Sequence, residues 1–135
     1  MKNIIKLNIL FIMLFVSVQA CSAATCPTAD EVKAKMRSFQ MQAIKNMNNN
    51  NASSSDALKL LEEQEKYNKN MFYGCVEYFK TEANPDCSRF STLSTGYMLL
   101  GNSEKGNAKT QLDTLINRLN NKCPNETNTL ELLMK

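Results

Sequence analysis

The stretch SDALKLLEEQEKYNKNMFYGCVEYFK, residues 55–80, decides the fold. Its apolar side chains recur at helical spacing, and charged pairs such as Glu62 and Lys66, four residues apart, suit a solvent-facing side. We expect one helix from Ser55 or Asp56 to about Lys80. Its inward residues are then Leu58, Leu61, Met71, Phe72, Cys75, Val76 and Phe79.

A shorter amphipathic segment precedes this stretch. Thr28 and Glu31 have the spacing of a capping box, so a helix is expected from about residue 29 to 47. Residues 46–55, NMNNNNASSS, are polar, and their side chains compete with helical backbone bonding. They are expected to form the loop between the two helices. The apolar face of the first helix comprises Val32, Met36, Phe39, Ala43 and Met47.

Proline and glycine divide the chain after the long helix. Pro85 closes that helix, Asp86 or Ser88 is the expected cap of a third helix, and Gly101 with Asn102 ends it. The inward face of the third helix comprises Phe90, Leu93, Tyr97 and Leu100.

A fourth helix is expected after a polar loop at residues 103–107. Asn107 is its expected cap, its apolar face leads to Cys123, and Pro124 ends it. A second capping-box pattern, starting at Asn128, predicts a short terminal helix. The apolar residues of these two helices are Leu112, Leu115, Ile116 and Leu119, then Leu130, Leu133 and Met134.

The alternating or β-branched runs typical of strands are missing from the sequence, so the expected fold class is all-α. The helices should form a small bundle of two antiparallel helical hairpins plus a short C-terminal helix. Residues 25–135 are expected to form a single helical domain.

The first residues have the order of a secretory signal peptide. Lys2 and Lys6 precede an apolar run at residues 7–18, and the small-residue stretch QACSAATC follows. The run is short of the roughly 20 residues that cross a membrane as a helix. We expect the protein to be exported, and to be periplasmic or tethered to the outer membrane if bacterial, otherwise secreted.

Two cleavage positions compete. Residues 18–21, Val-Gln-Ala-Cys, resemble a lipoprotein box, and cleavage there would remove residues 1–20 and leave Cys21 as a lipidated N-terminus. Residues 22–24, Ser-Ala-Ala, instead suit ordinary signal peptidase, which would remove residues 1–24. A cut before Cys21 without lipidation is the third alternative, and it keeps an odd thiol.

The chain has five cysteines, and an odd thiol is unfavourable in an oxidising compartment. Lipidation or excision of Cys21 leaves four. If neighbouring helices form antiparallel hairpins, Cys26 lies within one turn of Cys75, and Cys87 lies within one turn of Cys123. We therefore predict the disulfides Cys26–Cys75 and Cys87–Cys123, each closing the open end of a helical hairpin.

Charge and composition argue against several function classes. Lys2 and Lys6 belong to the leader, so the rest of the 16 basic residues nearly balance the 13 acidic ones, which does not favour nucleic-acid binding. The sequence has no histidine, which removes the commonest general base and most zinc sites. We expect a protein that is not an enzyme, with no catalytic residue, metal or cofactor, and with membrane contact only through a lipid on Cys21.

Aromatic residues are concentrated in the second half of the stretch at residues 55–80. They span more than one face of the helix, which favours a surface for interaction with a partner. The competing interpretation is that a central helix contacted from two sides needs two apolar faces. The candidate interaction surface comprises Tyr67, Phe72, Tyr73, Tyr78 and Phe79.

Residues 87–134 contain Cys-x-x-Phe near a helix start, a Gly-Tyr followed by a further Gly, and Cys-Pro-Asn before Thr-Leu. This layout resembles small periplasmic helical families, namely the acid-stress periplasmic chaperones and, more loosely, the helical immunity proteins against type VI secretion toxins. The resemblance implies a bridge between Cys87 and Cys123. The matching positions are Cys87, Phe90, Gly96, Tyr97, Gly101, Cys123, Asn125, Thr129 and Leu130.

These patterns predict a non-enzymatic exported protein that binds another protein, as an immunity protein, an inhibitor or a periplasmic chaperone. One alternative is a carrier of a small hydrophobic ligand or lipid, held in an internal pocket. The other alternative is an outer-membrane lipoprotein assembly factor, which requires acylation of Cys21. The pocket of the carrier would be lined by Met71, Phe72, Leu93, Tyr97 and Leu115.

Overall fold

The computed structural model describes residues 25–135, and all regular structure in this range is helical. The all-α fold class is therefore confirmed for this part of the chain. The predicted leader at residues 1–24, its alternative cleavages and Cys21 lie outside the described residues. The elements are α2 (Ala29–Asn48), α3 (Ser54–Thr81), the 3-10 turn η1 (Cys87–Arg89), α4 (Phe90–Leu99), α5 (Asn102–Leu119) and α6 (Pro124–Leu133).

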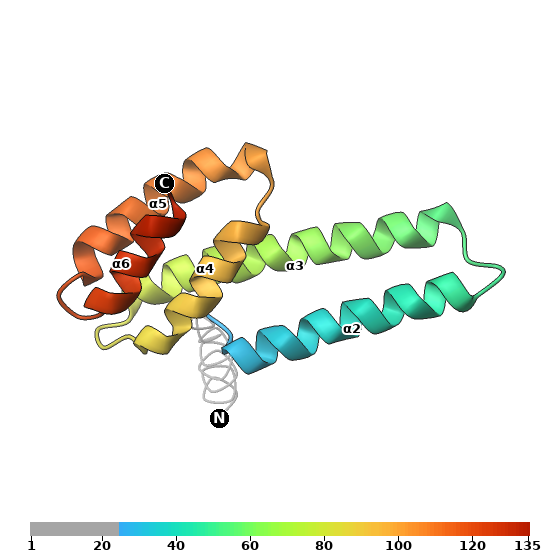
Figure 1. The fold of residues 1–135 in the computed structure, drawn as a ribbon, viewed down its shortest axis with the longest axis horizontal. Helices are drawn as coiled ribbons and strands as arrows, with labels where there is room; N and C mark the ends of the chain where they lie inside the picture. Colours follow the sequence, from blue (N-terminus) through green and yellow to red (C-terminus); the bar gives the residue numbers. More distant parts are fainter. Residues whose placement is uncertain (1–24) are drawn as a thin grey trace, which may run out of the picture.

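Helices α2 and α3 form a long antiparallel hairpin (Figure 1). The capping box predicted at the start of α2 is present, since the Glu31 N–H donates to the Thr28 hydroxyl and the Thr28 N–H donates to the Glu31 carboxylate. A second capping box, between Ser53 and Asp56, starts α3. Because this box starts α3 at Ser54, the loop at residues 49–53 is shorter than the predicted loop at residues 46–55.

The far end of this hairpin extends beyond the other helices as an arm, defined here as residues 40–65 (Figure 1). Leu60 is the only buried residue of the arm. The prediction that Met47, Leu58 and Leu61 point inward is wrong, since they are 76%, 60% and 61% exposed. The reason is that α4 and α5 pack against the other half of α3, so α2 is the only described helix beside the outer half.

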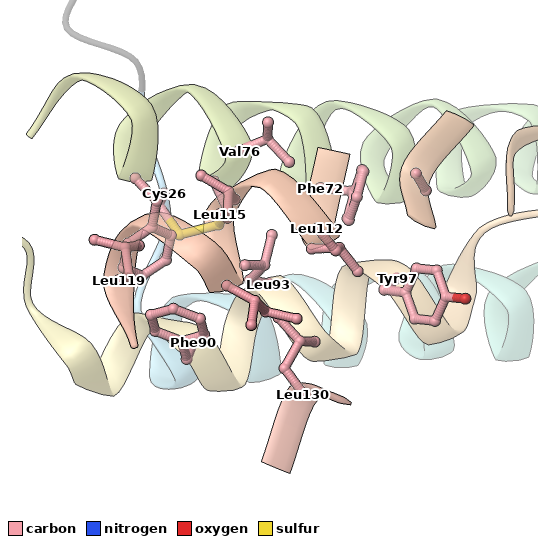
Figure 2. Close-up of a cluster of buried hydrophobic side chains, with 14 of the residues drawn as sticks. Cys26, Phe72, Val76, Phe90, Leu93, Tyr97, Leu112, Leu115, Leu119 and Leu130 are labelled. Atoms are coloured by element: carbon pink, nitrogen blue, oxygen red, sulfur yellow. A yellow bond between two sulfur atoms is a disulfide. The ribbon is translucent and has the colours of Figure 1, made fainter. Parts of the chain in front are cut away.

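The body of the protein forms where α4 and α5 pack against the second half of α3 and α6 packs against α4 and α5 (Figure 2). The second predicted hairpin is formed by α4 and α5. Helix α6 contacts both of them, so this hairpin is wider than the first. The inward faces predicted for the third and fourth helices are confirmed. The most deeply buried large side chains of the body are Phe72, Phe79, Leu93, Leu112, Leu115, Leu119 and Leu130.

The boundaries of the last two helices differ from the predicted ones. Helix α5 begins at Asn102 rather than after Asn107, because the backbone of Gly101 is extended and its carbonyl accepts the Glu104 N–H. Pro124 starts α6 instead of ending α5, which ends at Leu119. Proline lacks an N–H and has a helical φ, so it suits the first position of a helix.

Both predicted disulfides are confirmed. Cys26 and Cys75 are joined with their Cα atoms 4.3 Å apart, and Cys87 and Cys123 with theirs 5.7 Å apart. The first bridge fastens the segment before α2 to the second half of α3. The second fastens η1 to the turn between α5 and α6, so each bridge serves a different part of the fold.

Helices α3 and α4 approach closely at Gly96. A Cβ atom at this position would lie 3.1 Å from the Cα and Cβ atoms of Phe72. These atoms are fixed by the backbone of α3. We expect Gly96→Ala to lower the free energy of unfolding by about 1–3 kcal/mol, because it overpacks this crossing. Urea unfolding followed by circular dichroism measures the change.

The matched control for this substitution is Gly106→Ala in α5, where an added Cβ meets nothing within 4 Å. There the alanine should raise stability by about 0.5–1 kcal/mol, because glycine is entropically unfavourable inside a helix. Equal effects of the two substitutions would contradict the close approach at Gly96.

Candidate functional site

The predicted aromatic interaction surface is largely part of the core. Phe72 and Phe79 are 0% exposed, so they are not available to a partner, and including them in a surface was wrong. The reason is that α3 is contacted on two sides, by α2 and by α4 with α5. The Phe79 ring packs on Phe90 with 4.4 Å between centroids.

The three tyrosines of that set are partly buried and have partners within the chain. The Tyr73 hydroxyl donates to Glu104 at 2.9 Å and accepts from the Asn107 amide at 3.0 Å. The Tyr78 hydroxyl accepts the Asp86 N–H at 2.9 Å. Tyr67 packs edge-on against Phe39 with ring centroids 5.9 Å apart. These tyrosines join elements of the fold to one another.

The residues proposed to line a carrier pocket pack against one another instead. Phe72, Leu93 and Leu115 are completely buried, and the ring centroids of Phe72 and Tyr97 are 6.3 Å apart. Met71 is also buried. The hollows that could hold a ligand lie at the surface and are lined by other residues. The geometry therefore does not favour the carrier.

Several lysine and arginine side chains of the body donate hydrogen bonds to carbonyls at the C-terminal ends of helices. Arg118 and Lys122 donate to the carbonyls of Lys80 and Ala83 at the end of α3. Lys105 donates to the Tyr97 carbonyl at the end of α4, and its ammonium lies 4.1 Å from the centre of the Tyr97 ring. Cations at helix C-termini bond the free carbonyls and favour the helix dipole. These side chains therefore have a structural explanation.

One ion pair fixes the start of α5 against α3. The Lys69 ammonium donates to Glu104 at 2.5 Å, and Tyr73 donates to the other carboxylate oxygen. The hydrogen bond from Lys69, and then the one from Tyr73, lower the pKa of the Glu104 carboxyl. The cluster explains why α5 begins six residues earlier than predicted, at Asn102.

A surface groove of about 410 Å³ lies between α2 and α4. Val32 and Met36 form its apolar floor on the α2 side, and Thr92 and Thr95 contribute from α4. Lys33 and Arg37 also line it, whereas no acidic side chain does.

A second groove, of about 370 Å³, lies between the two helices of the arm. Met47 from α2 and the buried Leu60 and exposed Leu61 from α3 line it. No acidic or basic side chain lines this groove. Exposed apolar residues are also concentrated on the arm, namely Met41, Ile44, Met47, Leu58 and Leu61.

The apolar arm is the candidate functional site. Sequence reasoning placed three of its residues in the core because their spacing is that of a buried helix face. Ile44 was not predicted as part of any face. The signal for exposure is the polar loop beside them, since a turn at the end of a long hairpin lies far from the remaining helices.

The part of the chain from Thr25 onward contains no helix long and apolar enough to cross a membrane. Within the same residues, no group of three or more cysteine or acidic side chains could hold a metal ion. Neither a protein-family model, nor a curated protein, nor a solved structure matches the chain.

Proposed function

We propose that this is an exported, non-enzymatic protein that binds another protein through its helical arm. An immunity protein, an inhibitor or a periplasmic chaperone all work in this way, by burying part of their own surface on a partner. The single observation that carries the proposal is the arm's exposed apolar surface.

Leu58 and Leu61 of the arm lie on the same face of α3 as a buried apolar stripe, and Glu65 and Asn68 separate the two apolar parts of this face. Positions 58, 61, 65, 68, 72, 75 and 79 of α3 follow one another at alternating steps of three and four, which places them on one helix face. At Phe72, Cys75 and Phe79 this face is completely buried, whereas at Leu58 and Leu61 it is largely exposed. Contiguous exposed apolar surface is typical of interaction sites.

Export is supported by two features. The first is the leader pattern at residues 1–24, with Lys2 and Lys6 before an apolar run. The second is the pair of disulfides, because such bridges form and persist in oxidising compartments.

Photo-crosslinking in the cells that produce the protein tests the proposal. A photoreactive amino acid at Leu58, on the arm, is compared with the same amino acid at Leu132, which is equally apolar and 69% exposed on α6. We expect a discrete protein adduct from position 58 and none from position 132. The intact mass of the purified chain, measured in the same experiment with and without reduction, gives the N-terminus and the acylation state.

Three results would contradict the proposal. Adducts of equal yield at both positions, or none at position 58, would mean that the arm is not the binding surface. A full-length chain that retains Met1 and free thiols would mean that the protein is not exported.

A further inference from the structure

The two grooves lie along one face of α2. The residues that line the first are 29, 32, 33, 36, 37 and 40, and those that line the second from the same helix are 43, 46 and 47. Positions 29, 33, 36, 40, 43 and 47 follow one another at alternating steps of four and three, and the other three positions flank them, so all nine share one side of the helix. The α2 residues that line them extend from position 29 to position 47, about 27 Å at 1.5 Å per residue, and the two grooves placed end to end along this face are called the track.

This length and shape suit a helix better than a compact ligand. The track is apolar along its floor, with Val32 and Met36 at one end and Met47 and Leu61 at the other. An amphipathic helix that lays its apolar stripe into such a groove is a common mode of recognition. Methionine is flexible and polarisable, and it adapts to the side chains of a partner.

The two charged residues that line the track are both basic. Lys33 and Arg37 line it, and α2 has no acidic residue after Glu31. Lys33 lies 3.9 Å from Asp30, but both side chains are largely exposed, so the pair is weak. No ion pair joins Arg37 to another residue within the described range. A partner that approaches the track therefore meets positive charge from Arg37 and from the weakly paired Lys33.

We infer that the track binds an amphipathic helix with acidic residues along its flank, supplied by a partner protein. The inference rests on the proposed function, and it adds the chemistry of the partner segment. Its apolar residues cover Met47 and Leu61, and its carboxylates meet Lys33 and Arg37. A helix of about 18 residues fills the track from end to end.

Two designed peptides of this length test the inference. The two peptides have the same apolar stripe and the same overall helix propensity. The acidic peptide has glutamate beside the stripe, and the basic peptide has lysine at the same positions. Fluorescence anisotropy measures their affinity for the disulfide-bonded chain at residues 25–135, because peptide binding slows tumbling of the label. We expect the acidic peptide to bind at least about tenfold more tightly than the basic one.

Variants locate the binding on the track. Leu61→Asp, at an exposed position, should weaken binding of the acidic peptide by at least about tenfold, whereas the matched Leu132→Asp on α6 should leave it unchanged. The double variant Lys33→Glu with Arg37→Glu should reverse the preference between the two peptides. Lys109→Glu, an exposed charge reversal on α5, should not.

Several results would overturn the inference. They are equal binding of both peptides, no binding of either up to about 1 mM, and equal effects of the track variants and their controls. A chain that dimerises through Leu61 would mean that a second copy occupies the track. If the inference fails while position 58 still crosslinks a protein in cells, the proposed function stands with a partner of different chemistry.

Discussion

Replacing Phe72 by alanine is expected to lower the free energy of unfolding by about 3–5 kcal/mol, the usual cost of removing a fully buried aromatic ring. Phe72 is 0% exposed, and it packs edge-on against Tyr73 with ring centroids 5.0 Å apart. It also lies under Gly96 at the α3–α4 crossing, so the cavity forms where two helix backbones already touch. Urea unfolding followed by circular dichroism measures the loss.

The matched control is Leu58→Ala on the same helix and the same stripe, but on the arm. Leu58 is 60% exposed, so its truncation should change stability by no more than about 0.5 kcal/mol. If Phe72→Ala costs no more than Leu58→Ala, Phe72 belongs to a surface, and the original prediction of an aromatic interaction surface returns.

Removing the bridge by the double substitution Cys26→Ala with Cys75→Ala is expected to cost about 3–4 kcal/mol. The disulfide closes a loop with a sequence separation of 49, and the chain-entropy argument gives about this value for such a loop. The loss should be local, because Val32 and Phe39 are the only buried residues of α2. We expect α2 to detach before the body unfolds.

Amide hydrogen exchange tests this prediction, because it reports local opening of each helix. Exchange should accelerate throughout α2 and leave α5 protected. The control is Cys87→Ala with Cys123→Ala, which removes the second bridge and should accelerate exchange in η1 and at the start of α6. Protection of α2 equal to that of the unaltered chain would contradict the assigned role of the Cys26–Cys75 bridge.

Most of the fold was predictable because local rules agree with one another. The capping box at Thr28 specifies a helix start, and the spacing of Phe90, Leu93 and Tyr97 specifies a helix face. The distance that a disulfide requires specifies which cysteines pair at the open ends of the hairpins. The errors lie at helix ends. Asn107 has the residue type of a cap, but the contact of Glu104 with Lys69 extends α5 past it, and a contact between distant residues leaves no local pattern.

The candidate site was predicted less well, for a related reason. Spacing shows which residues of a helix share a face, but not whether another helix covers that face. Leu61 and Phe72 belong to one stripe of α3, and only the places where α4 and α5 begin and end separate the bare residue from the buried one. The expectation that a partner binds to the helix at residues 55–80 remains a proposal, with different residues.

The unbroken length of α3 has a mechanical consequence when a partner binds the arm. The helix is 28 residues long, about 42 Å, with no proline and no break, and it belongs to both the arm and the core. A force applied at the tip is therefore transmitted as torque to the body, because the rod has no hinge along its length to absorb it. The close crossing with α4 at Gly96 and the Cys26–Cys75 bridge hold the second half of α3 in place, so these two contacts resist the torque.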